Sequence, residues 1–276
     1  MRSQHRYVLG HDAREIERLQ LQAAVIGPVT RRLIEQSGIR TGMHVLDIGC
    51  GPGDVSMLLA DAVGETGRVV AVDREPRAIA VARMRAQSAG YRQIEFMVAS
   101  DESFATWTGL DAGFDAALGR YILISQADPV AMIRRAAAAV RCGGIVAFHE
   151  PASEVSGHTF PSMDLYATAE RRLNAAFRAT IPHIDAGCRL FAYFEAAGLA
   201  APRLIWESIA GGPESPLWRL FAMTYRSMFP HIARVEPALT EADDPDSLAE
   251  RLIAAAAAAR AQIVSKPQSC AWAIKA

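Results

Sequence analysis

Three features are missing from this sequence: clustered cysteines, an apolar leader and an excess of charge of one sign. The four cysteines lie far apart, with no Cys-x-x-Cys pair and no Cys/His cluster, which argues against a structural zinc site and a disulfide framework. Lys and Arg total 29 against 30 Asp and Glu, so the net charge of −1 gives no bulk attraction to nucleic acid or to an anionic membrane. The first residues are polar, and the most apolar run, 252–259, has about half the length that a bilayer requires. These absences favour a cytoplasmic, soluble protein with no membrane span.

The chain does contain enough apolar material for a large core. Of its 276 residues, 51% are hydrophobic and 21% are charged, which is ordinary for a globular protein. At roughly 150 residues per domain, this length predicts one large domain or two small ones.

Short apolar runs alternate with helical stretches in the first half of the chain. A stretch at 12–37 predicts two helices with a kink at Pro28, because proline is tolerated in the first turn of a helix. Strands and helices that alternate in this way indicate βαβ units and a parallel sheet covered on both faces. The strands are predicted within 45–51, 69–73, 94–100, 114–123 and 145–150, and the other helices at 54–63, 76–89 and 129–141.

After Glu150 the alternation breaks. The remaining predicted elements are helices at 162–180 and 186–199, a strand near 203–209, two helices before residue 266 and a terminal strand at 270–276. We interpret the chain as a single α/β domain of the Rossmann-like, doubly wound class, with a seven-stranded, mostly parallel sheet. It would comprise an N-terminal helical cap at 1–40, a core at 41–150, and helical lid insertions at 151–185 and 211–266 that fold over one edge of the sheet.

The segment 45–53, Val-Leu-Asp-Ile-Gly-Cys-Gly-Pro-Gly, carries the most functional information. Glycines between a strand and a helix remove side chains, so a ligand can lie against the backbone beside a helix N-terminus. In an open α/β sheet, such a turn falls at the carboxyl ends of the strands, where ligands bind. Asp73 closes the next strand, 20 residues after Gly53, where an acid can accept both hydroxyls of a ribose.

The spacing of these glycines separates two classes of ligand. The dinucleotide fingerprint Gly-x-Gly-x-x-Gly does not fit, because its sixth position is Asp54 when counted from Gly49 and Ser56 when counted from Gly51. Instead, an acid at Asp47 stands two residues before the first glycine and suits a ligand that carries an amino group. A nicotinamide-dependent oxidoreductase is therefore disfavoured.

These segments resemble the class I S-adenosylmethionine-dependent methyltransferases. VLDIGCGPG is similar to the first motif of that family, VVAVD to the second and FMVASD to the third. The resemblance covers the order of elements from Gly42 to Glu150. A second resemblance, from Tyr7 to Gly10 with further polar residues up to Gln22, is to the ubiquinone/menaquinone-type branch that acts on small molecules.

The resemblance implies S-adenosyl-L-methionine as cofactor and assigns residues to it. Asp47 and the glycine turn would line its methionine part, Asp73 would bind the ribose hydroxyls, and Asp101 would accept the adenine amino group. Arg120 would lie near the aminoacyl end, although an ion pair at the end of a strand explains it equally well. Cys50 would pack closely in the turn and not act as a nucleophile. The implied cofactor contacts are Tyr7, Gln22, Asp47, Gly49, Cys50, Gly51, Gly53, Asp73, Arg74, Ser100, Asp101, Glu102 and Arg120.

Candidate catalytic bases lie at the end of the fifth strand, where His149 and Glu150 stand side by side in the sequence. A base matters only when the acceptor must lose a proton before or during attack. Adjacent residues on a strand point to opposite faces, so the two should not both reach one ligand unless the strand has ended. His158, His183 and Tyr121 are weaker candidates.

The family's other motifs limit the acceptor. Metal-dependent members need extra acids near the fourth strand, and 118–125 has none, so no metal is expected. The Asn/Asp-Pro-Pro-aromatic motif of enzymes that methylate DNA bases is absent from 119–122, which makes a nucleic-acid substrate improbable. The aromatic and methionine residues of 216–229 favour a mid-sized apolar metabolite, whether the acceptor atom is O, C or N. The predicted substrate pocket contains Tyr121, His149, Tyr166, Trp218, Phe221 and Tyr225.

Three classes of function remain open at this point. The leading one is a small-molecule methyltransferase, for which the sequence leaves a homodimer open and does not fix the oligomeric state. The second is a protein that binds the cofactor without methylating, and the third is the oxidoreductase disfavoured above.

Overall fold

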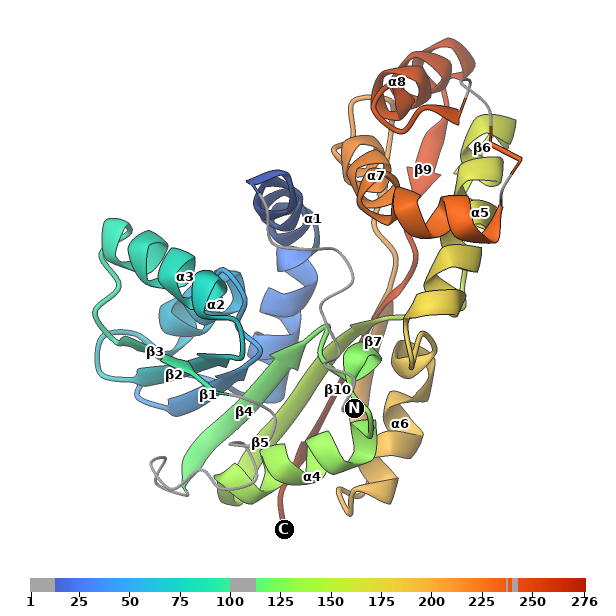
Figure 1. The fold of residues 1–276 in the computed structure, drawn as a ribbon. Coiled ribbons are helices and arrows are strands. Elements are labelled where there is room, and N and C mark those ends of the chain that lie inside the picture. The colour runs from blue at the N-terminus through green and yellow to red at the C-terminus, as the bar shows by residue number, and fades with distance from the viewer. Residues whose placement is uncertain (1–12, 100–112, 237, 240–242) are drawn as a thin grey trace, which may run out of the picture. The chain divides into compact units, whose positions relative to one another are not determined.

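Parallel strands form the main sheet of the protein (Figure 1), whose structure is a computed structural model that describes residues 13–99, 113–236, 238–239 and 243–276. The sheet has seven strands in the order β3-β2-β1-β4-β5-β10-β7, which confirms the predicted fold class. Buried runs of Val, Ile, Leu and Ala form its centre, as expected for strands covered on both faces. The strands are β1 His44–Ile48, β2 Arg68–Asp73, β3 Ile94–Val98, β4 Phe114–Arg120, β5 Val140–Pro151, β7 Arg203–Glu207 and β10 Gln268–Ile274.

The pairing of the strands brings their carboxyl ends to one edge of the sheet. β1 is parallel to β2 and to β4, β2 is parallel to β3, and β4 is parallel to β5. β10 runs antiparallel to β5, with Cys270 opposite His149 and Ser269 opposite Glu150. The start of β10 therefore lies beside the end of β5, at the edge where the sequence places its glycine turn.

Capping side chains and prolines in the sequence determine where the helices between the strands begin. The Asp128 side chain accepts the backbone N–H of Ala131 and Pro129 follows it, so α4 begins with a side-chain cap and a proline. Glu75 and Pro76 start α3 in the same way. These elements are α2 Asp54–Val63, α3 Pro76–Ser88, the short 3-10 helix η2 Leu123–Ser125, α4 Pro129–Ala139 and α6 Ala186–Ala196.

The first helix corrects one expectation. α1 runs without interruption from Ala13 to Ser37, with Pro28 inside it, whereas the sequence predicted two helices with a kink. Proline removes one backbone N–H from the helix, but the residues after it pack tightly: Val29 and Leu33 are fully buried. Burial of this helical face outweighs the one lost hydrogen bond.

The chain divides into two compact units. One comprises 27–151, 186–206 and 268–276, and contains the seven-stranded sheet. The other comprises 1–26, 152–185 and 207–267, so the two segments expected as insertions fall almost entirely within one unit. A three-stranded antiparallel sheet in this second unit was not predicted. The elements of the second unit are β6 His158–Phe160, α5 Asp164–Thr180, β8 Ala210–Gly211, α7 Leu217–Val235, α8 Leu248–Ala259 and β9 Gln262–Val264.

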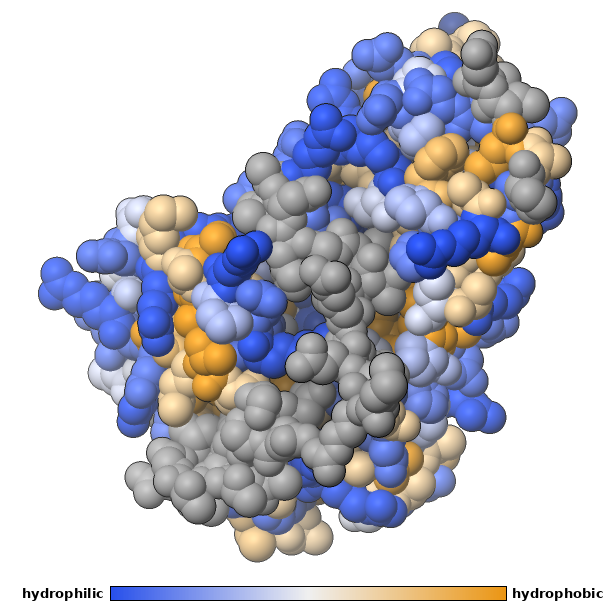
Figure 2. Space-filling view, viewed as in Figure 1, coloured by the Kyte–Doolittle hydropathy of each residue, from blue (hydrophilic) through white to orange (hydrophobic). Residues whose placement is uncertain are grey.

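The surface is mixed in character. On the face seen in Figure 2, hydrophobic residues reach the surface as small groups between hydrophilic ones. Within the described parts of the chain, no helix combines the length and apolar character needed to cross a bilayer.

Candidate functional site

The glycine turn lies between β1 and α2, as the sequence predicted. Cys50 donates its backbone N–H to the carbonyl of Val72 at 2.9 Å, which ties the turn to β2. Gly49 has a φ of +67°, and a Cβ there would come within 2.0 Å of Cδ1 of Ile122. Gly51 has a φ of +52°, yet no described atom lies within 4 Å of the place its Cβ would take. The turn is thus closed at Gly49 and open at Gly51, so a ligand can lie against the backbone there.

Asp73 faces this opening from the end of β2. Its Oδ2 accepts the backbone N–H of Gly51 at 2.8 Å, and its Oδ1 accepts that of Glu75 at 2.9 Å. The side chain is half-buried, and each carboxylate oxygen keeps further acceptor capacity. Two backbone donors therefore fix an oriented carboxylate beside Gly51.

A second carboxylate is buried behind the turn. The hydroxyl of Ser56 donates to Oδ2 of Asp47 at 2.6 Å, and Asp47 is 1% exposed. Burial raises the pKa of Asp47 to about 7, while the bond from Ser56 and the charge of Arg120 act in the opposite direction. A positively charged group near Asp47 would favour its ionised form.

Arg120 ends β4 and donates from Nη1 to the hydroxyl of Thr30 at 3.2 Å. Burial lowers the pKa of its guanidinium, and the nearby carboxylates of Asp54 and Asp47 oppose that shift. Arg120 nevertheless remains charged at neutral pH. Asp54 is itself paired, with Nη2 of Arg85 at 2.6 Å.

His149 is the centre of a buried hydrogen-bond chain. Its Nδ1 lies 3.1 Å from the hydroxyl of Thr30, and its Nε2 lies 3.1 Å from Oε1 of Gln268. Oε1 of Gln268 can only accept, and it also accepts the hydroxyl of Tyr121 at 2.6 Å. This arrangement assigns the ring proton to Nε2 and makes Nδ1 the acceptor from Thr30, whose oxygen accepts from Arg120.

The same surroundings keep His149 neutral. The residue is fully buried, and burial together with the charge of Arg120 lowers its pKa to about 3, although the bond to Gln268 acts in the opposite direction. The ring is therefore a neutral hydrogen-bonding group at physiological pH.

Glu150 points to the other face of β5, as the alternation along a strand requires. Its Oε1 accepts the backbone N–H groups of Ile122 and Leu123, each at 2.8 Å, and its Oε2 lies 3.4 Å from the N–H of Ile124. Burial raises the pKa of this carboxyl to about 8, and the three backbone donors lower it. Glu150 thus holds the loop whose Ile122 packs against Gly49.

Cys50 is a packed side chain of the glycine turn. Its side chain is buried, and burial raises the pKa of its thiol well above the usual value, with the charges of Asp47 and Asp73 acting in the same direction. The thiol therefore stays protonated and is a poor nucleophile.

The remaining predicted cofactor contacts stay predictions. Tyr7, Ser100, Asp101 and Glu102 lie outside the described residues, and Arg74 follows Asp73 as an exposed side chain. Gln22 belongs to the second unit, where its Oε1 accepts from Nη1 of Arg18 at 2.8 Å.

Four aromatic residues predicted for the substrate pocket lie in the second unit, and three of them, Tyr166, Trp218 and Phe221, form a cluster. The ring of Tyr166 lies 4.6 Å from that of Phe221 and 6.1 Å from that of Trp218, measured between centroids. Trp218 is fully buried and donates from Nε1 to the carbonyl of Gly212 at 3.0 Å, and Tyr225 is 2% exposed. Trp218 and Tyr225 are core residues of this unit, while Phe221 is half-buried. A role in acceptor binding stays a prediction for this cluster.

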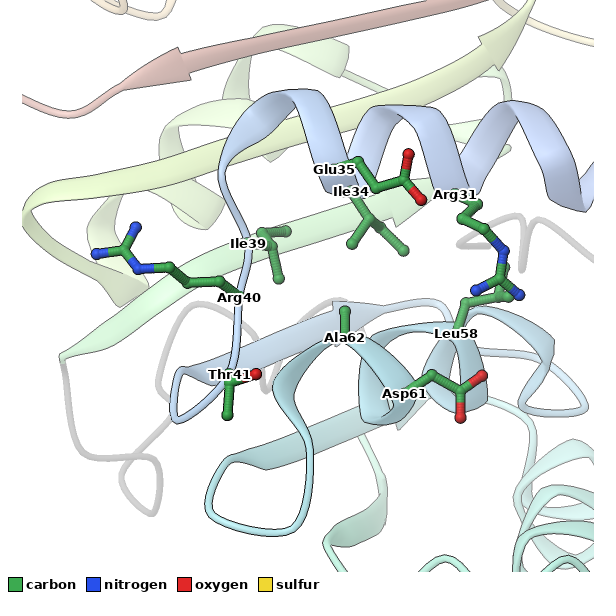
Figure 3. Close-up of a pocket in the computed structure, with 9 residues that line it drawn as sticks. All are labelled: Arg31, Ile34, Glu35, Ile39, Arg40, Thr41, Leu58, Asp61 and Ala62. Atoms are coloured by element: carbon green, nitrogen blue, oxygen red, sulfur yellow. The ribbon is translucent and has the colours of Figure 1, made fainter.

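A separate pocket lies between the C-terminal half of α1 and α2 (Figure 3). Ile34 and Ile39 form part of its apolar wall, with Arg40 at one end and Arg31 near Asp61 at the other. Arg40 lies four residues before His44, the amino end of β1, whereas ligands of open α/β sheets bind at the carboxyl ends. We therefore do not assign this pocket to the site. Among the described side chains there is also no group of three His, Cys, Asp or Glu placed to hold a metal ion.

Sequence reasoning missed the partners of His149. Thr30 and Gln268 each lie 119 residues away from it in the chain, on α1 and β10. Neither belongs to a motif, and no local pattern marks them. The one available signal was the last strand of the chain. This strand returns antiparallel beside β5, so its first residue, Gln268, lies near the site.

Comparisons with known proteins relate the chain to methyltransferases. A family model described as a methyltransferase domain matches residues 39–190. Aklanonic acid methyltransferase DauC of Streptomyces sp. (strain C5) is 38% identical over 135 residues, which cover 49% of this chain and 59% of that protein. A demethylmenaquinone methyltransferase of Symbiobacterium thermophilum is 34% identical over 64 residues, covering 23% of this chain and 26% of that protein. The chain thus spans less than two thirds of the length of either relative.

Solved structures share the fold. A S-adenosylmethionine-dependent methyltransferase from Aquifex aeolicus superposes with a TM-score of 0.54 at 18% identity, covering 71% of this chain and 93% of that one. At this identity the likeness shows the fold alone.

Proposed function

The chain belongs to the methyltransferase-domain family, and we propose that it transfers the methyl group of S-adenosyl-L-methionine to a mid-sized, largely apolar organic metabolite. The observation that carries the proposal is the opening at Gly51 with the oriented carboxylate of Asp73 beside it. A non-methylating protein that binds the same cofactor is the alternative.

The residues present fit the cofactor. Asp73 would accept the ribose hydroxyls with the acceptor capacity that its two backbone bonds leave. Asp47 would favour the cationic amino group, and Arg120 offers N–H donors for the carboxylate of the methionine part. Asp101 and Glu102 remain proposed for the adenine side.

When bound, the cofactor supplies an electrophilic methyl group on a sulfonium centre. The chain's own task is to hold the acceptor in line at about 3 Å and to exclude water, which can account for roughly 7–11 kcal/mol of the barrier. None of the described side chains beside the glycine turn needs to form a covalent bond for this displacement.

We propose that His149 positions Arg120 and Tyr121 and does not act as a general base. A base works best when its pKa lies near the operating pH, and the pKa of His149 is about 3. Both ring nitrogens are already engaged, with Thr30 and Gln268. Glu150, bound to three backbone N–H groups, would position the loop at 122–124 in the same indirect way.

The first prediction tests the role of His149. His149→Gln should retain turnover within about tenfold, because the glutamine amide can still donate to Gln268, whereas loss of a general base costs roughly 10²–10⁴-fold. The measurement is kcat and KM from pH 6 to 8, with thermal melts of each variant. A drop of 10³-fold in kcat with an unchanged melting point would show that His149 takes the proton.

The acceptor is proposed from the relatives and from the aromatic cluster. The names of the two relatives give aklanonic acid and demethylmenaquinone as what they act on, and both are small organic molecules. The half-buried ring of Phe221 beside Tyr166 offers an apolar surface for such a molecule. No nucleic-acid partner is proposed.

The experiment that tests the function has two arms. Calorimetry with S-adenosylmethionine, S-adenosylhomocysteine and NADH should give binding of the first two only. Turnover is then measured with methyl-labelled cofactor and a panel of hydroxylated naphthoquinones and anthraquinone carboxylic acids. Transfer of label to a panel member supports the proposal, binding without transfer to any acceptor favours the non-methylating alternative, and binding of NADH alone overturns both.

The second prediction tests the open side of the glycine turn. Gly51→Ala should weaken S-adenosylmethionine binding at least about tenfold, because a methyl group would fill the opening. Gly90→Ala is the matched control: its φ is +84° and its Cβ would also meet nothing within 4 Å, but it lies after α3 and away from the turn. Each variant should lose roughly 1–2 kcal/mol of stability from the left-handed backbone. Equal affinity in the two variants would place the cofactor elsewhere.

A further inference from the structure

The strand β7 forms one edge of the main sheet and is paired on one side by β10. An edge strand presents backbone N–H and C=O groups that can pair with another strand, and proteins usually blunt such edges with charged side chains, lysine above all, with proline or with a bulge. The five residues of β7, Arg-Leu-Ile-Trp-Glu, include neither lysine nor proline, and the two charges that they carry are of opposite sign. Its side chains are also unusually exposed for an apolar strand.

The two faces of β7 differ in chemistry. The guanidinium of Arg203 lies over the ring of Trp272 on β10, 5.8 Å from its centroid, so Arg203 shares the face of Trp272. By alternation, Ile205 and Glu207 lie on that face as well. Leu204 and Trp206 lie on the opposite face, where they are 46% and 50% exposed. These are large apolar areas to leave in water on a strand of this length.

The sequence of the strand is complementary to itself when reversed. In an antiparallel pair of two copies centred on Ile205, Arg203 of one copy stands opposite Glu207 of the other, and this happens twice. Leu204 stands opposite Trp206, also twice, and Ile205 meets Ile205. One face of the pair then carries two opposite-charge pairs, and the other carries four contiguous apolar side chains.

We propose that β7 pairs antiparallel with β7 of a second copy of this chain, which joins two seven-stranded sheets into one continuous sheet across a two-fold axis. A two-fold interface uses the same patch on both subunits, and self-complementarity of this kind is what it requires. The charge complementarity of Arg203 and Glu207 also fixes the register, because a shift by one residue places Arg203 opposite Trp206 or Ser208, and neither carries a negative charge. A strand of five residues buries little surface, so the dimer dissociates in the micromolar range.

Sedimentation velocity of the full chain from about 1 to 100 µM tests the proposal. The native chain should show a monomer–dimer equilibrium. Arg203→Glu and Glu207→Arg should each raise the dissociation constant at least about tenfold, because two attractive cross-strand pairs become two repulsive ones. The double variant R203E/E207R should restore the native constant within about threefold, since the pairs re-form with the charges exchanged.

Two further variants separate the interface from general effects. Arg77→Glu reverses the charge of an exposed residue on α3, at the other end of the sheet, and should leave the dissociation constant unchanged. Trp206→Glu should abolish the dimer while thermal melts stay close to native, because the side chain is half exposed. A native chain that is monomeric at 100 µM, or a double variant that stays as weak as the single ones, overturns the proposal. An unchanged dimer in Trp206→Glu does the same, and moves the interface to another surface.

Discussion

Replacing Asp73 by alanine should weaken S-adenosylmethionine binding about 30- to 150-fold while the chain stays folded. The carboxylate is held by the N–H groups of Gly51 and Glu75 at 2.8 and 2.9 Å, so its remaining acceptor capacity is already oriented for two vicinal hydroxyls. Two charge-assisted hydrogen bonds to a ligand account for roughly 2–3 kcal/mol, which corresponds to this change in affinity. Isothermal titration calorimetry with thermal melts of both proteins measures the effect.

A cofactor analogue distinguishes a direct contact from a loosened turn. The native protein should bind S-adenosylhomocysteine more tightly than its 2′-deoxy analogue, and Asp73→Ala should lose that preference. If the variant binds both weakly but still prefers the hydroxyl, the carboxylate only orders the turn. If its affinity for S-adenosylmethionine is unchanged, the assignment of this acid is wrong.

Removing the carboxyl group of Glu150 should lower the free energy of unfolding by about 2–4 kcal/mol. Glu150→Ala leaves the N–H groups of Ile122, Leu123 and Ile124 without their acceptor, and Leu123 is fully buried. Glu150→Gln keeps an amide oxygen for the two 2.8 Å bonds and should cost much less. Urea unfolding at pH 6 measures both variants, and equal losses would contradict the role of the acceptor oxygen in holding this loop.

The same residue makes stability depend on pH in a defined direction. The pKa of Glu150 is about 8 in the fold against an ordinary value of 4.5, so the folded state binds more protons than the unfolded one between these values. The free energy of unfolding should therefore fall as pH rises from about 4.5 to 8, by at most about 1.4 kcal/mol per pH unit for this group. Asp47, with a pKa of about 7, makes the free energy of unfolding fall with pH in the same way, but its contribution ends near pH 7.

Glu150→Gln should flatten the dependence of the free energy of unfolding on pH between pH 7 and 8. Asp47→Asn should leave this dependence unchanged between pH 7 and 8 but make it less steep below pH 7. Urea titrations at half-unit intervals of pH separate the two groups. A native slope that survives unchanged in Glu150→Gln contradicts a buried, protonated carboxyl at this position.

The elements that local sequence determines were predicted well. The helix 54–63 has the predicted bounds, and Gly49 and Gly51 have the positive φ that a turn of glycines permits. Both depend on residues that are neighbours in the chain. Asp73 at the end of β2 was placed by the same short-range logic, because the length of a βαβ unit fixes where the second strand ends.

Features that depend on distant residues were not predictable from pattern. Pro28 stays inside one helix whose Val29 and Leu33 are fully buried, and Thr30 on this helix contacts His149 and Arg120, which lie far along the chain. The three-stranded sheet of the second unit uses strands of two or three residues, too short to show alternation. The pKa of His149 follows from burial and from Arg120, and neither is visible in the residues beside it.

The position of β10 has a consequence for the order in which the sheet can form during synthesis. β10 lies between β5 and β7, yet it is made 117 residues after β5 ends, since β5 ends at Pro151 and β10 begins at Gln268. At about 5–20 residues per second, the outer side of β5 waits roughly 6–23 s for its partner. During that interval β5 is itself an unpaired edge, and the polar chain through His149 lacks Gln268. Until β10 has been synthesised, the nascent protein must keep this edge of β5 from pairing with a wrong strand.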